Sequence, residues 1–427
     1  MASTFENLPF ELLEMIFKHL RRPPYSVYSL ALTCRKFYII TTPTLYSSIC
    51  LTNLVSLEKL ARTLQENSWL SSLVLELQVH FHSDQTEETH NPLLNVILQM
   101  PNLKALVLRS LPLKDILEPT NHRLLSNLMR HRDNIQIEPP TQYVGERLRS
   151  LYLGAAFEGY YGDGWLLGAS EVVFYMEQLE KLHIQGANIE YVRPDLFAAI
   201  LPSRKTALKD LSLLNCDLSP DTLEQILAFP NGLTHFTMKG SWPDPSGRFT
   251  SWGHSHIIYP NQYVEKFKES SSAGLEYLDL DPWYAESLPD YDSLDCLKHL
   301  VIPLHTYELQ GVGLNESSAG VPMPSLPASL ETLAFHDFNQ VGISLDSLVE
   351  KVKAGELPNL RAIEYQKLYG QDQEATGGED WQNETKSLRE LGVELSVASR
   401  RGSSILLPEN DNWPCQCWIF DLEVAWW

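Results

Sequence analysis

The sequence lacks the features of a secreted or membrane-spanning protein. Among its 427 residues there is no run of about 20 apolar residues, the length that crosses a bilayer as a helix. The first residues, MASTFENLPF, lack the charged start and apolar core of a secretion signal. The six cysteines stand mostly far apart in apolar runs, which fits reduced thiols better than a disulfide framework. We therefore expect an intracellular protein, cytoplasmic or nuclear, with no membrane partner.

Motifs that carry catalysis or hold cofactors are also missing. The chain has no G-x-S-x-G, no H-E-x-x-H and no phosphate-binding G-x-x-x-x-G-K-S/T. His80 with His82, and His254 with His256, are spaced like ligand pairs, but no third or fourth ligand follows at zinc-site spacing. We expect no metal, no cofactor and no enzyme in its own right, although scattered Asp and Glu leave an acid/base pair open.

Positive charge is scarce outside the N-terminal region. The formal net charge is −21, of which the first 50 residues carry +2 and the remainder −23. Such a surface repels phosphate backbones, which argues against nucleic acid as the main ligand and leaves only a local basic patch open. A composition of 44% apolar and 20% charged residues is that of a folded chain, long enough for two or more domains.

The first 50 residues predict short helices. Pro9 suits the first position of a helix, and Glu11 lies in the first turn near the positive end of the helix dipole. Apolar residues then recur at helical spacing until the prolines at 23 and 24. They are Leu12, Leu13, Ile16, Phe17 and Leu20.

A second apolar stripe consists of Leu30, Cys34 and Phe37. Pro43 predicts a break, after which Leu45, Tyr46 and Ile49 would form a short third helix. Three short helices in about 45 residues bury little surface among themselves, so some of these apolar residues should face a partner.

This stretch resembles the F-box, whose pattern runs from Leu-Pro through a Glu-Leu-Leu helix with Ile-Phe to Cys-Arg-x-aromatic. The matching residues are Leu8-Pro9, Glu11-Leu12-Leu13, Ile16-Phe17, Leu20, Leu30 and Cys34-Arg35-Lys36-Phe37-Tyr38. Two departures are Phe37, where many members carry Trp, and the missing acidic residue at the start of the second helix. The resemblance implies docking on the Skp adaptor of a cullin-based ubiquitin ligase. The alternative is an ordinary helical cap on the next domain.

The resemblance implies a non-catalytic receptor subunit, and it assigns nine residues to adaptor docking and the packing behind it. They are Leu8, Pro9, Leu12, Leu13, Ile16, Leu20, Leu30, Cys34 and Phe37. In such a complex the receptor holds a target protein near a conjugating enzyme and supplies proximity alone. A competing hypothesis is a scaffold that binds the Skp adaptor without cullin-dependent ubiquitination.

Past residue 50 the main signal is an internal repeat of the form L-x-x-L-x-L, whose final alternation predicts a short strand. Eleven frames occur, beginning at Leu70, Leu103, Leu148, Leu179, Leu208, Leu233, Leu275, Leu297, Leu330, Leu360 and Leu388. The unit at Leu208 continues best, because Cys216 and Leu218 follow at the next inward positions of a leucine-rich repeat.

Helix signals lie between these frames. Ser219-Pro220 predicts a cap with a first-turn proline, and Pro92, Pro194 and Ser344 open similar amphipathic pieces. Units of strand, turn and helix cannot bury their apolar faces alone, so they should stack into a solenoid with a curved parallel sheet. The region resembles the divergent leucine-rich repeats behind F-boxes, especially in fungal proteins. The alternative is an unrelated α/β domain with Leu-rich strands.

Two long intervals between frames are rich in aromatic residues. Residues 154–170 contain Tyr160, Tyr161 and Trp165, and residues 239–264 contain Trp242, Arg248 and Trp252. Aromatic side chains on loops with Arg nearby are typical of interface anchors, so these six residues are candidates for binding a substrate protein. The alternative is that they fold down and complete the core.

The predicted fold class is therefore α/β. A three-helix F-box-like domain at 1–52 precedes an irregular leucine-rich-repeat solenoid at 53–408 and an aromatic cap at 409–427. In the tail, Cys415 and Cys417 are too close for the usual C-x-x-C clamp, and Trp418, Phe420 and Trp426 would cover the last repeat. The predicted function is substrate recognition in an SCF-type (Skp-cullin-F-box) ubiquitin ligase, with an unknown target protein.

Overall fold

The computed structural model describes most of the chain. The described residues are 8–19, 24–80, 90–111, 147–155, 165–168, 172–174, 176–192, 205–214, 216–239, 260–270, 274–281, 289–303, 323–337, 345–367 and 386–399. The chain forms two compact units, Met1–Asn188 with Ser203–Leu208, and Ile189–Pro202 with Lys209–Trp427. None of the described helices is long and apolar enough to span a membrane. The domain limits predicted at 52 and 408 stay predictions.

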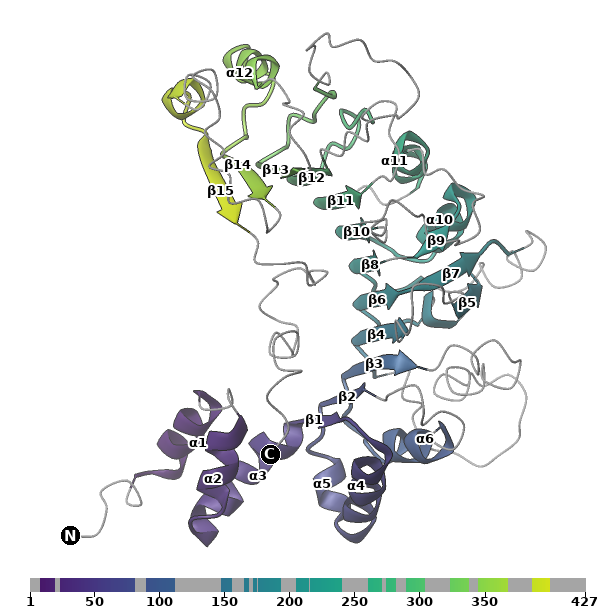
Figure 1. Ribbon diagram of the computed structural model, residues 1–427, viewed down its shortest axis with the longest axis vertical. Helices are drawn as coiled ribbons and strands as arrows, with labels where there is room; N and C mark the ends of the chain where they lie inside the picture. Colours follow the sequence, from purple (N-terminus) through teal and green to yellow (C-terminus); the bar gives the residue numbers. More distant parts are fainter. Residues whose placement is uncertain are drawn as a thin grey trace, which may run out of the picture. The chain divides into compact units, whose positions relative to one another are not determined.

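The first unit begins with helices and continues as a parallel sheet (Figure 1). Its helices are α1 (Phe10–His19), α2 (Pro24–Ala31), α3 (Arg35–Ser47), α4 (Leu54–Glu66), α5 (Ser68–Ser71) and α6 (His90–Leu98), with a 3-10 turn at Val172–Phe174. The strands β1 (Ser48–Leu51), β2 (Glu76–His80), β3 (Ala105–Leu111), β4 (Ser150–Ala155) and β6 (Lys181–Gln185) pair in parallel in this order. Two short strands are β5 (Trp165–Gly168) and β7 (Ala187–Glu190).

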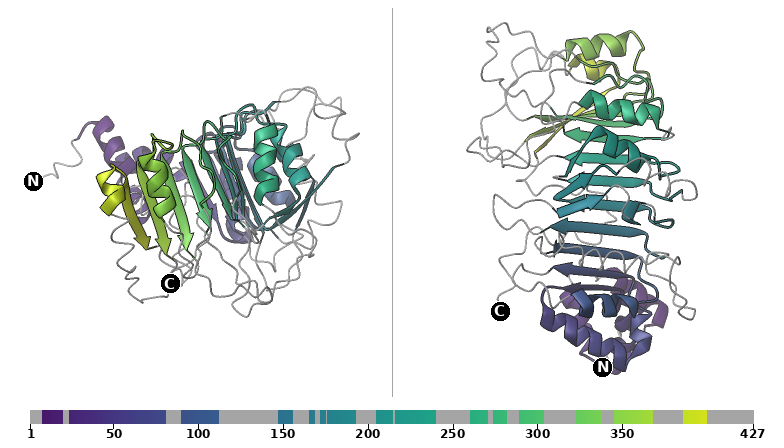
Figure 2. Two further views of the ribbon diagram at one scale, coloured as in Figure 1. Left: turned by 90° about the horizontal axis from the view of Figure 1, so that it is seen from above. Right: turned by 90° about the vertical axis from the view of Figure 1, so that its right-hand side faces the viewer.

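The second unit repeats the same construction. The strands β8 (Asp210–Leu214), β10 (His235–Lys239), β11 (Tyr277–Asp281), β12 (His299–Pro303), β13 (Thr332–Asp337), β14 (Ala362–Lys367) and β15 (Glu394–Ser399) form a parallel sheet. A short strand β9 (Asp217–Leu218) leads into α10 (Pro220–Leu227), and α11 (Pro260–Glu269) and α12 (Asp346–Lys353) follow. Figure 2 shows α10 and α11 together on one face of the strands of this unit.

The strands from β2 to β13 in the two parallel sheets place two apolar side chains, two residues apart, in a buried row. In the first unit Leu106 pairs with Leu151, and Leu151 with Leu182, and all three are at most 1% exposed. Nine of the eleven predicted frames coincide with strands in this way, from Leu103 to Leu360. The mixed α/β fold with a long parallel sheet and N-terminal helices is thus as predicted. The leucine-rich-repeat solenoid and its curvature are not established by the sheets and stay predictions.

Two of the predicted frames are in the wrong register. Leu70 lies in α5. The buried apolar residues that follow are Val74, just before β2, and Leu77 and Val79 within it, and Leu77 pairs with Leu106. The β-branched Val residues were missed because the pattern required Leu. Leu388 lies in a helical turn instead of preceding a strand.

That helical turn ends at Gly392, whose φ of 83° redirects the chain before β15. The N–H of Val393 closes the turn by donating to the carbonyl of Leu388 over 3.0 Å. The strand that follows therefore carries Leu395 and Val397 in its paired rows instead of Leu391 and Val393.

The break predicted at Pro43 is also wrong, because Pro43 lies inside α3. Thr41 Oγ1 donates to the Phe37 carbonyl over 2.7 Å, and Thr42 Oγ1 donates to the Tyr38 carbonyl over 2.6 Å. These bonds lie one turn before Pro43, whose missing N–H leaves the carbonyl of Ile39, four residues back, without its usual helical donor. The expected third short helix around Ile49 is instead β1, the first strand of the sheet.

The repeat unit at Leu208 matches its predicted inward positions. Leu208, Leu211, Leu213 and Leu218 are at most 1% exposed, and Cys216 is 7% exposed with Sγ 3.5 Å from the Leu214 carbonyl. The following helix begins as predicted, because Ser219 Oγ accepts from the backbone N–H of Thr222 over 3.1 Å and Pro220 stands in the first turn.

The register of β2 gives a stability prediction. Leu77→Ala should lower the free energy of unfolding by about 2–5 kcal/mol, because it leaves a cavity at a fully buried position. Leu75→Ala should cost less than about 1 kcal/mol, because Leu75 is 40% exposed. Urea unfolding followed by circular dichroism compares the two variants. Equal losses, or a larger loss for Leu75→Ala, would contradict the register.

Candidate functional site

The three N-terminal helices pack around a small aromatic and aliphatic core. Leu13 and Phe17 of α1 meet Phe37 and Ile40 of α3, and all four are at most 5% exposed. The rings of Phe17 and Phe37 meet edge to face with centroids 5.5 Å apart. Lys36 Nζ also donates to the carbonyl of Leu8 over 3.3 Å and ties the entry of α1 to α3. This core closes without the apolar residues on the other faces of the helices.

Those other faces carry large exposed apolar side chains. On α1 Phe10 is 49%, Leu12 44% and Met15 56% exposed. The rest are Tyr28, Leu32, Tyr38 and Ile39, each at least 50% exposed, with Leu32 the most exposed at 69%. A helix that is apolar on two faces buries one in its own core and leaves the other for a partner. The three helices therefore present a candidate docking surface, defined by these seven residues and the exposed Pro9.

The structure separates the nine predicted docking residues into three groups. Leu13 and Phe37 are interior, so they support the surface from below. Those that are partly buried and packed against the core are Leu8, Ile16, Leu30 and Cys34. Pro9 and Leu12 are exposed, and Leu20 lies outside the described residues. The docking role of these residues stays a prediction.

Sequence reasoning missed most of the exposed apolar set, namely Phe10, Met15, Tyr28, Leu32, Tyr38 and Ile39. It followed one apolar stripe per helix and assigned that stripe to both core and partner. The signal was present in α1, where Leu12 and Met15 repeat three residues apart beside the core positions.

The predicted substrate-binding aromatics cannot be placed. Tyr160, Tyr161, Trp242, Arg248 and Trp252 lie outside the described residues. Trp165 begins β5, but its side chain is not described. The aromatic tail at 409–427 and the histidines at 82, 254 and 256 also lie outside.

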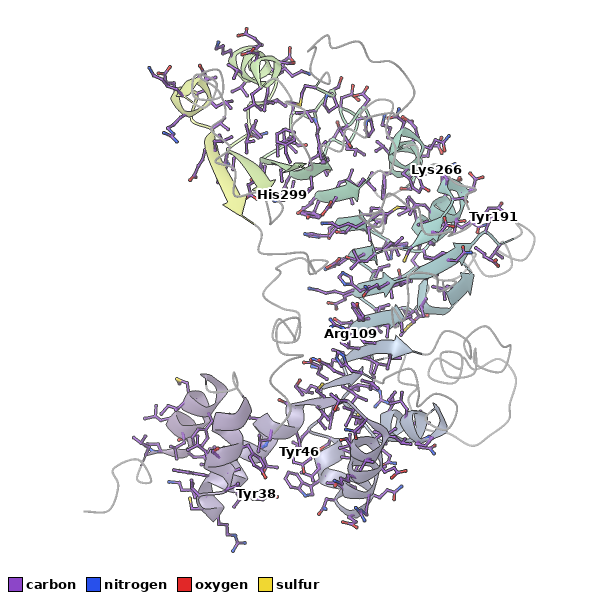
Figure 3. All side chains as sticks on the ribbon, viewed as in Figure 1. Tyr38, Tyr46, Arg109, Tyr191, Lys266 and His299 are labelled. Atoms are coloured by element: carbon purple, nitrogen blue, oxygen red, sulfur yellow. The ribbon has the colours of Figure 1, made fainter. Side chains whose placement is uncertain are left out.

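On the sheet of the first unit, several chemically distinctive side chains stand in adjacent rows. The Arg109 guanidinium lies over the Tyr152 ring, with Cζ 4.9 Å from the ring centroid. The Tyr152 hydroxyl donates to Gln185 Oε1, and the Tyr152 and His183 rings are 5.9 Å apart. Figure 3 shows Arg109 on the side of the strands away from α6. Arginine over an aromatic ring is a common recognition element.

His183 is fully buried beside this pair. Burial, together with the nearby charges of Lys181 and Arg109, lowers the pKa of the His183 imidazole from 6.5 to about 3. His183 is therefore neutral at physiological pH and adds no positive charge to its surroundings.

The sheet of the second unit carries a stack of rings across three strands. His235 of β10 stacks on Tyr277 of β11 with centroids 5.7 Å apart, and His299 of β12 lies 6.5 Å beyond. Beside them Lys239 Nζ forms an ion pair of 2.7 Å with Asp279 Oδ2, and both side chains are largely buried. Because Lys239 and Asp279 neutralise each other, we interpret this group of side chains as packing on the sheet and not as an acid/base site.

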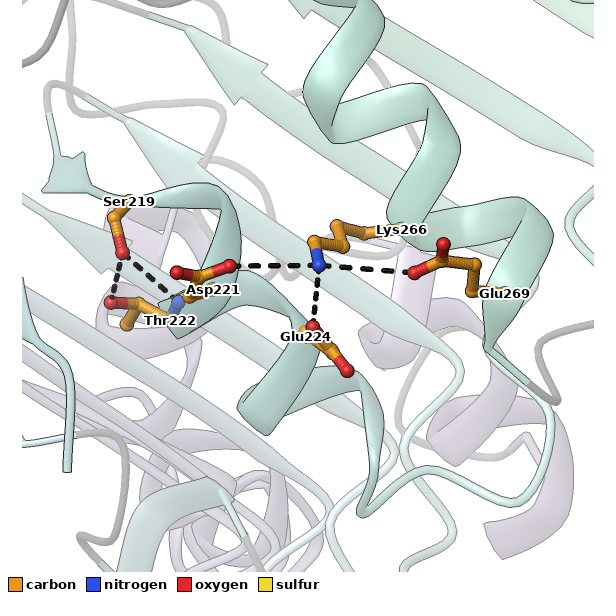
Figure 4. Close-up of polar contacts among 6 residues, drawn as sticks. All are labelled: Ser219, Asp221, Thr222, Glu224, Lys266 and Glu269. Atoms are coloured by element: carbon orange, nitrogen blue, oxygen red, sulfur yellow. Dashed lines mark hydrogen bonds and ion pairs between the residues drawn. The ribbon is translucent and has the colours of Figure 1, made fainter. Parts of the chain in front are cut away.

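One lysine joins the two helices of the second unit (Figure 4). Lys266 Nζ of α11 is 2.5 Å from Glu224 Oε2 of α10, with Asp221 at 3.5 Å and Glu269 at 3.8 Å. The hydrogen bond to Glu224 raises the pKa of the Lys266 ammonium. An ammonium held by three carboxylates is a positioned cation, which fits a helix clamp and not a nucleophile. Among the described residues no group of three or more His, Cys, Asp or Glu is placed to hold a metal ion.

Comparison with known families gives one finding for this helical region. Residues 5–52, which contain α1, α2, α3 and β1, match the F-box-like family. No curated protein matches the chain. The match supports an F-box protein, and F-box proteins are generally non-catalytic adaptors in SCF ubiquitin ligases that bind the Skp adaptor.

The buried His183 gives a pH-dependent prediction. Its folded-state pKa lies below the unfolded value, so the unfolded chain binds the extra proton and stability is lost as pH falls below about 6.5. At pH 5 this group alone should cost about 2 kcal/mol relative to pH 7. His183→Gln should remove that part of the pH dependence, measured as urea unfolding at both pH values. Parallel losses in the wild type and the variant would contradict the buried neutral state.

Proposed function

We propose that the chain is the substrate-recognition subunit of an SCF-type ubiquitin ligase. The F-box-like helices bind the Skp adaptor and through it the cullin, and the sheet region holds a target protein. The observation that carries this proposal is the exposed apolar surface of α1, α2 and α3, which lies in the segment that matches the F-box-like family. A surface of this kind gains free energy when a partner covers it, about 25 cal/mol per Å² of apolar area.

The proposed mechanism is proximity. The receptor holds lysines of the target near a charged conjugating enzyme and raises their effective concentration, while the bond-forming groups belong to other subunits. A receptor of this kind needs a fixed distance between its two binding regions. The direct passage from α3 into β1 at Ser47 and Ser48 supports such a connection.

The proposed target-binding region is a leucine-rich-repeat solenoid of the type found behind F-boxes in fungal proteins. The strand rows in register and the buried Cys216 of the Leu208 unit support the repeat assignment. The loop residues Tyr160, Tyr161, Trp165, Trp242, Arg248 and Trp252 remain part of the proposal. The net charge of −21 favours a protein target over nucleic acid. We place the complex inside the cell, in the cytoplasm or nucleus.

The docking surface gives a binding prediction. Replacing Leu12 and Met15 together by Ala should weaken Skp-adaptor binding at least tenfold, about 1.4 kcal/mol, because both side chains lose apolar contact with the adaptor. Both are exposed, so the free energy of unfolding should change by less than about 1 kcal/mol. Isothermal titration of purified chain with adaptor measures the affinity.

The matched control is Val55→Ala on α4, an apolar residue that is 57% exposed outside the three helices. It should bind the adaptor as tightly as the wild type. An unchanged affinity in the Leu12/Met15 double variant, with the same fold by circular dichroism, would contradict docking through this surface.

The complete complex tests the proposed ligase role against the scaffold alternative. We expect the purified chain to recover both the Skp adaptor and a cullin from a mixture of the purified subunits. Recovery of the adaptor alone would favour a scaffold that binds the adaptor without cullin-dependent ubiquitination. Recovery of neither would overturn both forms of the proposal.

A further inference from the structure

Arg109 and Tyr152 form a cation–π contact between adjacent strands of the first unit. Arg109 of β3 lies over the Tyr152 ring of β4, and the Tyr152 hydroxyl is held by Gln185 of β6. Gly154 makes room for the ring, because a Cβ at this position would stand 2.8 Å from Tyr152 Cε1. The ring is therefore held at its hydroxyl by Gln185 and has room beside Gly154, and the Arg109 guanidinium lies over it.

Arg109 is an unusual cation in an acidic chain. Its Nε is buried and has no hydrogen-bond acceptor, and its guanidinium forms no ion pair within the described part of the chain. Arg109 as a whole is only partly buried, and a guanidinium carries four further N–H donors besides the one at Nε.

Another arginine of the first unit, Arg149, has a carboxylate partner of its own. Arg149, the residue before β4, forms an ion pair of 3.2 Å with Glu180. The charges of Lys181 and Arg109 contribute, after burial, to the lowered pKa of His183, which stays neutral.

We propose that Arg109, supported by Tyr152, is the anion subsite of the target-binding surface and takes a side-chain carboxylate from an acidic segment of the target protein. A guanidinium presents two parallel N–H donors that match the two oxygens of one carboxylate. The Tyr152 ring lies against one face of the guanidinium.

The charge balance favours a carboxylate over a phosphate. One guanidinium neutralises a single negative charge, and the neutral His183 contributes none. A phosphate monoester carries −1.5 to −2 at neutral pH. In a chain of net charge −21 the second charge of a phosphate would be repelled without compensation. A monoanion therefore fits this site better than a dianion.

The inference rests on the proposed function, because it names the chemistry of the target segment. It is tested on the purified full chain without adaptor, so its failure is separate from failure of the docking surface. The probe is a labelled, amidated decapeptide of glycine, serine and glutamate, compared with the same peptide carrying glutamine in place of glutamate. The net charge of the chain disfavours the glutamate peptide in general, so a preference for it has to come from a local site.

We expect fluorescence anisotropy to show the glutamate peptide binding about tenfold more tightly than the glutamine peptide. Arg109→Gln should remove this preference, and Arg109→Lys should retain only part of it, because an ammonium lacks the two-pronged geometry. Gly154→Ala should also reduce the preference by displacing the Tyr152 ring. The control Arg149→Gln should keep the wild-type preference, because that arginine is paired with Glu180.

Circular dichroism and urea unfolding of the same preparations confirm that each variant is folded. Equal affinities of the two peptides for the wild type would overturn the proposal, as would a preference that survives in folded Arg109→Gln. A phosphoserine peptide that binds more tightly than the glutamate peptide, and depends on Arg109, would overturn the assignment to a carboxylate.

Discussion

The fold depends on the burial of paired apolar rows along parallel strands. A single short strand with two apolar side chains cannot remove them from water, and each strand here does so only against its neighbours. In the first unit the row runs through Leu77, Leu106 and Leu151, and in the second through Leu211, Phe236 and Leu278. Backbone hydrogen bonds between these strands are satisfied at the same time, so register and burial reinforce each other.

This constraint reaches into the segment that matches the F-box-like family. The first member of the row is Ile49, which lies in β1 and pairs with Leu77. β1 follows α3 without an intervening loop, and α3 carries Phe37 and Ile40 of the helical core. The helices and the first strands are thus parts of one compact unit. The F-box-like segment does not end before the sheet but supplies its edge strand.

The sequence predicted the strands better than their boundaries and better than the site. Leucines at alternate positions predict a strand with one buried face. Nine of the eleven frames coincide with strands for this reason. Around β2, Val74 before the strand and Val79 within it take the places of two of these leucines, so the frame that requires Leu falls on α5 instead. Pro43 is typical of a helix end, but α3 continues through it to Ser47. Helix and strand limits depend on packing against neighbouring elements, which a pattern of single residues does not contain.

The candidate site shows the same division. The residues that resemble the F-box pattern include Leu13 and Phe37 of the helical core, because the spacing of a buried stripe is visible in the sequence. The exposed apolar residues do not pack in that core, so the core pattern does not predict them. Arg109 and Tyr152 are 43 residues apart and meet only because β3 and β4 pair. The spacing of these two residues in the sequence does not predict their contact, which follows only from the register of β3 and β4.

Hydrogen–deuterium exchange of the full chain, alone and with the Skp adaptor, tests the central claim most directly. We predict that the adaptor slows exchange in α1, α2 and the first turns of α3, where the exposed apolar side chains lie, and leaves β8 to β15 unchanged. Protection confined to the strands, or absent from the three helices at saturating adaptor, would contradict docking through the F-box-like segment.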